Sequence, residues 1–150
     1  MSPEEAIAVV EAAFAGAPRP SNAELLHPDC ADDADIVALY AFDDWRGVPD
    51  DVLEREYAAL SFLSASGFLY FLPAYMRFAL RHPDGGAAVV SSTVWSLQPS
   101  LYDEPLAAFA RSKFVLLDAA HRRAIVAFLE AMAPYEDTTS ALDDWGVAGA

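Results

Sequence analysis

The sequence predicts an all-α fold, in which one compact domain over residues 1–150 holds about six helices around a central apolar helix. Alanine, the strongest helix former, makes up about a fifth of the chain. Apolar residues recur at spacings of three and four in several segments, which is the period of one helix face. The run FLYFLPAYMRFAL at 68–80 is apolar on almost every side, so other helices must surround it. Only residues 1–2 and 147–150 are expected to fray.

The first helix has clear signals at both ends. Ser2 is suited to the N-cap, and Pro3 is suited to the first helical position. The apolar stripe consists of Ile7, Val10 and Phe14. Gly16 is expected to end the helix, because glycine tolerates the backbone conformation at which helices stop.

The next part of the chain carries weaker signals. Residues 17–34 predict a polar connection with a short helical turn at 23–27. A helix is favoured over 36–42, although its apolar pairs are also typical of a short strand, and 43–47 predicts a loop. Pro49 then opens another helix. Its apolar positions are Leu53, Tyr57, Leu60 and Leu63.

The central helix contains a proline, which makes its start ambiguous. Ser64 or Ser66 is expected to cap it, and it runs to about His82. Pro73 removes the backbone donor that would bond to the carbonyl of Leu69. The helix therefore either bends at the proline or begins later. Its narrow polar face consists of Tyr70, Arg77 and Arg81.

The second half of the chain predicts four more helical segments. Residues 87–97 fit a helix or an alternating strand, and we favour helix because no nearby segment offers a strand partner. A short helix is expected near 105–110. Asp118 caps a clear helix over 119–132, and 138–145 forms a short last helix. The buried face of the helix after Asp118 consists of Ile125, Phe128, Leu129 and Met132.

Charge and cysteine content exclude several classes of protein. The formal net charge of −14 repels nucleic acid and anionic membranes, so neither is an expected partner. No apolar run reaches the roughly 20 residues that cross a bilayer. Cys30 is the only cysteine, so no intrachain disulfide forms, and a reducing cytoplasm is expected. The single lysine beside eight arginines, with abundant alanine, suggests a bacterial genome of high GC content.

No motif has the spacing of an active site. Residues 29–35 lack the positions of a calcium loop, and zinc there would find only His27 and Cys30 beside carboxylates. We therefore expect no metal and no cofactor. His121 has no G-x-S-x-G serine to activate, so we expect no catalytic residue. The one basic cluster consists of Arg111, Lys113, Arg122 and Arg123. It would bind an anion or, as we prefer, pair with acidic segments of the same chain.

A ligand-binding hypothesis concerns the proline of the central helix. A bend there would open an aromatic pocket with tyrosine hydroxyls inside, and apolar clefts with few polar groups are typical ligand sites. The candidate ligand-binding residues are Tyr70, Pro73, Tyr75 and Arg77. Such a pocket would take a small apolar ligand.

The motifs LSFLS at 60–64 and YFLPAYM at 70–76 are similar to those of a small bacterial family of unknown function. The resemblance continues through Trp45, 94–99 and 117–129. It covers most of 35–132, and it implies no activity and no functional residue. His121 stands where similar sequences are expected to carry Gln or Glu, which weakens a role as a base.

The leading interpretation is a non-catalytic, cytoplasmic protein-interaction domain. Its acidic surface would bind a basic protein partner, in the manner of an immunity or accessory factor, and salt would weaken the complex. The alternative is a small-molecule binder or enzyme that uses the aromatic pocket near Pro73. A homodimer that buries Trp95 or Trp145 is a third possibility, and the sequence leaves the oligomeric state open.

Overall fold

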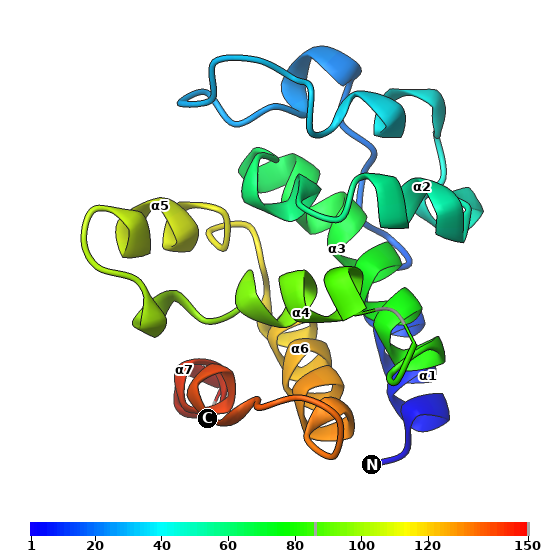
Figure 1. Cartoon of the computed structure of the whole chain (residues 1–150), viewed down its shortest axis with the longest axis vertical. Coiled ribbons are helices and arrows are strands. Elements are labelled where there is room, and N and C mark those ends of the chain that lie inside the picture. Colours follow the sequence, from blue (N-terminus) through cyan, green and yellow to red (C-terminus); the bar gives the residue numbers. More distant parts are fainter. Residues whose placement is uncertain (86, 150) are drawn as a thin grey trace.

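The computed structural model describes residues 1–85 and 87–149, and within them every regular element is helical (Figure 1). The α-helices are α1 (Pro3–Ala13), α2 (Asp50–Arg55), α3 (Ala65–Arg81), α4 (Ala87–Trp95), α5 (Leu106–Ser112), α6 (Ala119–Met132) and α7 (Thr139–Gly149). The 3₁₀ turns are Asn22–Glu24, Val37–Ala41, Trp45–Gly47, Ala59–Ser61 and Pro99–Leu101. The all-α prediction is confirmed. No helix among the described residues is long and apolar enough to cross a bilayer.

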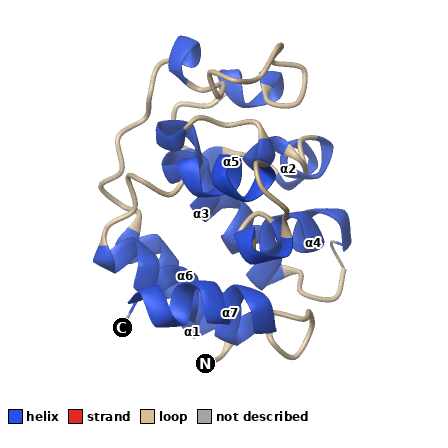
Figure 2. Cartoon of the chain, turned by 90° about the vertical axis from the view of Figure 1, so that its left-hand side faces the viewer, coloured by secondary structure: helices blue, strands red, loops and turns tan. Residues whose placement is uncertain are grey.

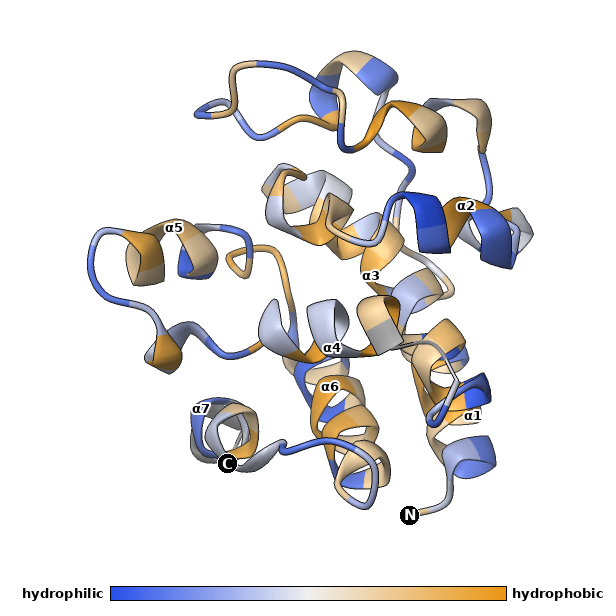
Figure 3. Ribbon diagram, in the orientation of Figure 1, coloured by the Kyte–Doolittle hydropathy of each residue, from blue (hydrophilic) through white to orange (hydrophobic). Residues whose placement is uncertain are grey.

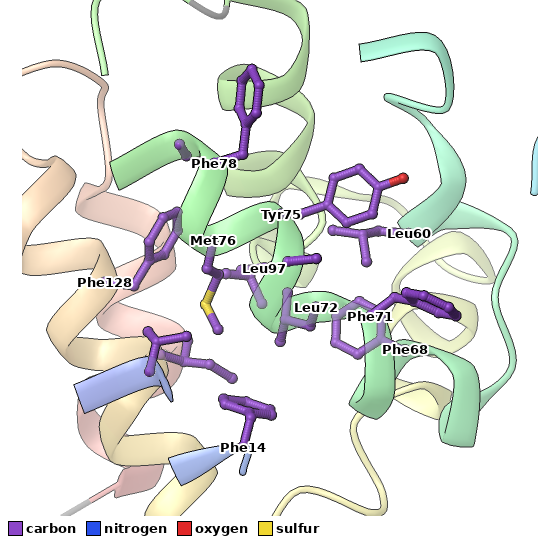
Figure 4. Packing of buried hydrophobic residues seen from close by; sticks show 14 of the residues in the cluster. Phe14, Leu60, Phe68, Phe71, Leu72, Tyr75, Met76, Phe78, Leu97 and Phe128 are labelled. Atoms are coloured by element: carbon purple, nitrogen blue, oxygen red, sulfur yellow. The ribbon is translucent and has the colours of Figure 1, made fainter. Parts of the chain in front are cut away.

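Helix α3 forms the centre of the molecule, with α1, α4 and α6 packed around it (Figure 1). Thirteen of its 17 residues are buried, as expected for a helix that is apolar on nearly every side. Close up, three helices contribute to one layer of the core: Phe14 comes from α1, Met76 from α3 and Phe128 from α6 (Figure 4). Helix α7 packs against α6.

The start of α3 is fixed by its cap. The Ser64 side chain accepts a hydrogen bond from the Gly67 amide at 3.1 Å, and the helix continues through Pro73 to Arg81. Of the two alternatives, a late start at the proline is therefore wrong. Close packing favours glycine at position 67, because a Cβ there would lie 3.0 Å from the carbonyl oxygen of Leu25, closer than an ordinary contact.

The segment around Leu26 is bound to the residues just before α3. Leu26 pairs with Leu63 in an isolated antiparallel bridge, and the His27 amide donates to the Phe62 carbonyl at 2.8 Å. The helical turn predicted at 23–27 occurs slightly earlier, at Asn22–Glu24. The bridge places His27 next to α5, where its Nε2 lies 3.1 Å from Ser112 Oγ.

Three predictions before α3 need correction. The single helix expected from Pro49 to residue 63 is broken, because α2 ends at Arg55 and the backbone of Glu56 leaves the helical region. The Tyr75 hydroxyl donates to the freed Glu56 carbonyl at 2.6 Å, and Tyr57 turns out to solvent. The segment 36–42 is helical and not a strand, but its helix, Val37–Ala41, is of the 3₁₀ type. The loop expected at 43–47 contains another, capped by the Asp44 side chain.

The second half agrees more closely with expectation. Helix α4 confirms the helical alternative for its segment, and α6 has the predicted bounds. Asp118 caps α6 as predicted, and His121 completes a capping box by accepting from the Asp118 amide at 3.1 Å. The last helix extends further than expected, to Gly149, while residue 150 lies outside the described residues. His121 thus has a structural role at a helix terminus.

Candidate functional site

The two tyrosines predicted to line a pocket instead bind backbone groups. Tyr70 donates to the Asp43 carbonyl at 2.7 Å and accepts from the Trp45 amide at 3.1 Å. The Tyr75 hydroxyl is fully buried against the Glu56 carbonyl, and burial raises the pKa of this phenol. Each hydroxyl therefore secures a different loop to α3.

Arg77 joins Tyr70 on the same face of α3, whereas Tyr75 faces elsewhere. The Arg77 guanidinium donates to the Arg46 carbonyl at 2.8 Å and lies 5.0 Å from the ring of Trp45. Pro73 is buried within the helix. None of these four predicted residues lines the three cavities described below, all of which adjoin α5.

The segment 96–118 stands out from the helical core and carries α5 (Figure 1). In the view turned by 90°, α5 lies in front of α3 (Figure 2). Only Ala107 and Ala110 of α5 are buried, while Leu106 is 61 % exposed. Helix α5 therefore contributes little to the hydrophobic core.

The first cavity, of about 160 Å³, lies against Lys113 and is called the Lys113 cavity. Its walls include Ser61, Ser96, Tyr102, Leu106, Phe109 and Lys113. The lysine is only 4 % exposed, and its Nζ donates to the Ser61 carbonyl at 3.3 Å and lies 4.5 Å from the Phe109 ring. Burial disfavours the charged form and lowers the pKa of Lys113 to about 8.

The second cavity, of about 500 Å³, lies on the other side of Phe109 and is lined by His27, Asp29 and Ser112 among others. His27 Nε2 is 3.1 Å from Ser112 Oγ, and the Asp29 backbone amide donates to His27 Nδ1 at 3.0 Å. The three side-chain types are those of a hydrolase triad, so their hydrogen bonds decide whether they can act as one.

The hydrogen bonds oppose catalysis by Ser112. Because His27 Nδ1 accepts a hydrogen bond, the neutral ring carries its proton on Nε2 and donates it to Ser112. Ser112 in turn donates to the Phe109 carbonyl at 2.6 Å. A general base would need the opposite tautomer, with a free Nε2 lone pair facing the serine. Burial also lowers the pKa of His27, which keeps the ring neutral.

The neighbouring cysteine is also poorly suited to act as a nucleophile. Cys30 is half-buried, with Sγ 3.9 Å from the Phe62 carbonyl, and burial raises the pKa of its thiol. The thiolate, which is the nucleophilic and metal-binding form, is therefore disfavoured. Within residues 1–85 and 87–149, no three His, Cys, Asp or Glu side chains gather in the geometry of a metal site.

The third cavity, of about 370 Å³, divides the predicted basic cluster. Arg111 and Arg122 line it together with Asp144 and Trp145. Arg111 pairs with Glu104 at 2.6 Å, and Arg122 lies 5.3 Å from the Trp145 ring. Lys113 points to a different cavity. The expected pairing with acidic segments is thus realised for Arg111.

Sequence reasoning missed Lys113 as an individual site residue. One signal was available: it is the only lysine of the chain, beside eight arginines, and it precedes the apolar run 114–117. Lysine accepts burial with a shifted pKa more readily than arginine, which stays charged. Its partner Ser61, however, lies 52 residues away, so spacing alone does not reveal the contact.

Comparison with protein families gives a match over nearly the whole chain. Residues 2–149 match the model of a family of unknown function, DUF6714, and the chain belongs to this family. No curated protein and no solved structure gives a match.

Proposed function

We propose that this chain is a non-catalytic domain that binds a basic protein partner through residues 29–56, here called the acidic cap. The carrying observation is the concentration of charge. The acidic cap holds ten carboxylates against two arginines, a net charge of −8 out of −14 for the whole chain. A field of one sign steers an oppositely charged partner and weakens with salt.

Much of this charge is available to a partner. Five carboxylates of the acidic cap are exposed and take part in no salt bridge among the described residues: Asp32, Asp35, Asp43, Asp51 and Glu54. Asp50 differs, because it pairs with Arg81 at 2.6 Å. The hydrophilic stretches of the acidic cap are coloured blue in Figure 3, at the top of the view and in the first turn of α2.

The acidic cap also offers apolar contacts. Val37 within the cap is 48 % exposed, and Tyr57, the residue directly after it, is 47 % exposed. Protein interfaces combine a central apolar or aromatic contact with a polar rim, and tyrosine is enriched in them. This combination of charge and apolar surface supports a protein partner over a simple counter-ion. We propose the cytoplasm as the setting and an accessory or immunity-like role for the domain.

The test compares the wild-type chain with two variants of equal net charge in affinity capture at low salt. The cap variant carries Asp35→Asn, Asp43→Asn and Asp51→Asn. The control variant carries Glu4→Gln, Asp84→Asn and Glu130→Gln, which are exposed acids outside the cap. A captured protein is then identified and purified, and its Kd is measured against all three chains.

The proposal expects one basic protein that the wild type and the control variant retain and that the cap variant binds at least about tenfold more weakly. Its affinity should fall as the salt concentration rises. If nothing is retained at low salt, or if both variants lose the partner equally, the acidic cap is not the binding surface.

A further inference from the structure

We propose that the Lys113 cavity binds a small monocarboxylate, with the ligand carboxylate on the Lys113 amine and the ligand's apolar body against Phe109 and Leu106. This inference concerns a different surface from the acidic cap and is independent of it. It follows from the position of the amine, the absence of a counter-charge and the size of the cavity.

The amine lies at the wall of the cavity. It contacts the Ser61 carbonyl at 3.3 Å and the Phe109 ring at 4.5 Å, and both of these residues line the cavity. An ammonium has three donors, and Ser61 is its only hydrogen-bond acceptor among the described residues. Two donors are therefore left for a ligand, on a side chain that is more than nine-tenths buried.

Among the described residues, the charge of Lys113 has no acidic partner. The chain holds 23 acidic residues, yet in the described part of it none forms a salt bridge with Lys113. The group whose charge would favour the ammonium is the Cys30 thiol, which burial keeps protonated. A buried ammonium without a counter-ion is costly, and a bound carboxylate supplies the missing charge.

The cavity limits the size and polarity of the ligand. Its volume of about 160 Å³ resembles that of an engineered cavity of about 150 Å³ that holds benzene. The hydroxyls of Ser96 and Tyr102 already donate to the carbonyls of Thr93 and Trp95. Lys113 is thus the strongest available donor, and a ligand with a second charged group would bury that charge without a partner.

The third cavity, which Arg111 and Arg122 line, is a weaker candidate for binding anions. Arg111 is paired with Glu104, and Asp144 lines the same space. An anion there would compete with a carboxylate that the chain provides. The Lys113 cavity has no such competitor in the residues described.

Benzoate is the probe, since its ring fits the volume and its single charge matches the amine. Saturable binding is measured by isothermal titration and by amide chemical shifts, with benzamide as the neutral analogue. A ligand of about nine non-hydrogen atoms can reach a Kd on the order of 1 mM or tighter. The variants are Lys113→Met, which removes the charge at similar length, Leu106→Trp, which narrows the entrance, and Arg111→Gln, which alters only the other cavity.

The expected result is that benzoate shifts the amides around residues 102–113 and binds about tenfold or more tightly than benzamide. Lys113→Met and Leu106→Trp should each weaken benzoate by about tenfold or more, while Arg111→Gln leaves its Kd within about twofold. The proposal is overturned if the wild type shows no saturable binding, if Lys113→Met binds benzoate as well as the wild type, or if Arg111→Gln is the variant that loses it.

Discussion

Helices α3 and α5 bury polar groups in opposite ways. On α3, the hydroxyls of Tyr70 and Tyr75 each reach a backbone group of a neighbouring loop at 2.6–3.1 Å. Just after α5, Lys113 is as deeply buried but has a single carbonyl at 3.3 Å. The first arrangement satisfies its polar groups within the chain, and the second leaves donors free at a cavity wall.

The difference indicates which part of the molecule is framework and which part is suited to binding. Buried groups whose hydrogen bonds are all formed stabilise a single conformation. A buried charge with unused hydrogen-bond donors lowers stability and is able to bind a ligand. Functional regions are commonly drawn from the less stable parts of a fold. The predictions below test whether α3 and the α5 region differ in this way.

The largest contrast is expected for apolar truncations. Phe71→Ala removes a fully buried ring of α3 and should lower the free energy of unfolding by about 3–5 kcal/mol. Leu106→Ala, on the exposed side of α5, should change it by less than about 0.5 kcal/mol. Urea denaturation of both variants measures the difference, and similar losses would contradict the contrast.

The second contrast has the opposite sign. Lys113→Met should raise the free energy of unfolding at pH 7 by up to about 3 kcal/mol, because folding lowers the lysine pKa from 10.5 to about 8. Between pH 8 and 10.5 the unfolded wild type binds more protons than the folded one, so wild-type stability rises with pH.

The stabilisation by Lys113→Met should therefore shrink across this range and vanish above it. Urea denaturation at pH 7, 9 and 11 checks this, with Arg111→Gln as a control that keeps the wild-type pH profile. An advantage that is the same at every pH would show that packing, and not the buried charge, accounts for the gain.

A third comparison concerns tyrosine hydroxyls. Tyr75→Phe leaves the buried Glu56 carbonyl without its donor and should cost about 1–2 kcal/mol. Tyr102→Phe removes a more exposed hydrogen bond to Trp95 near α5 and should cost about 0.5 kcal/mol. Equal costs in thermal unfolding would place the two hydroxyls in equivalent surroundings.

The smallest effect is expected at acid pH. Folding lowers the pKa of His27 below 6.5, mainly through burial, so the unfolded chain binds more protons as the pH falls. Stability should decrease below pH 6.5 and recover above it. His27→Gln removes this contribution, and the gap between the two chains in urea denaturation should change between pH 5 and 7. A constant gap would exclude His27 as the source.

Local signals made part of the fold predictable. The starts of α3 and α6 follow from Ser64 and Asp118, since a cap and an apolar period lie within a few residues of each other. The break after α2 was not predictable, because it depends on a hydrogen bond from Tyr75, 19 residues further on. The 3₁₀ segments were not predictable either, because the spacing of their apolar residues is also that of an α-helix.

The candidate site was less predictable than the fold. The acidic cap is visible in the sequence because charge needs no geometry. The Lys113 cavity cannot be recognised in the sequence, because its walls come from positions between 61 and 113 that only the fold brings together. Its chemistry also depends on the fact that none of its lining residues is acidic. The pocket predicted around Tyr70 rested on residue type alone, and the hydrogen bonds of that side chain depend on the loop at 43–45.

The attachment of the acidic cap has a consequence for how the family can vary. Tyr70 and Arg77 hold the cap through the carbonyls of Asp43 and Arg46 and the amide of Trp45, which are main-chain atoms. Every amino acid except proline supplies both groups. Exposed side chains of the cap can therefore be exchanged without changing these main-chain contacts, whereas Trp45 is buried and its ring lies 5.0 Å from the Arg77 guanidinium.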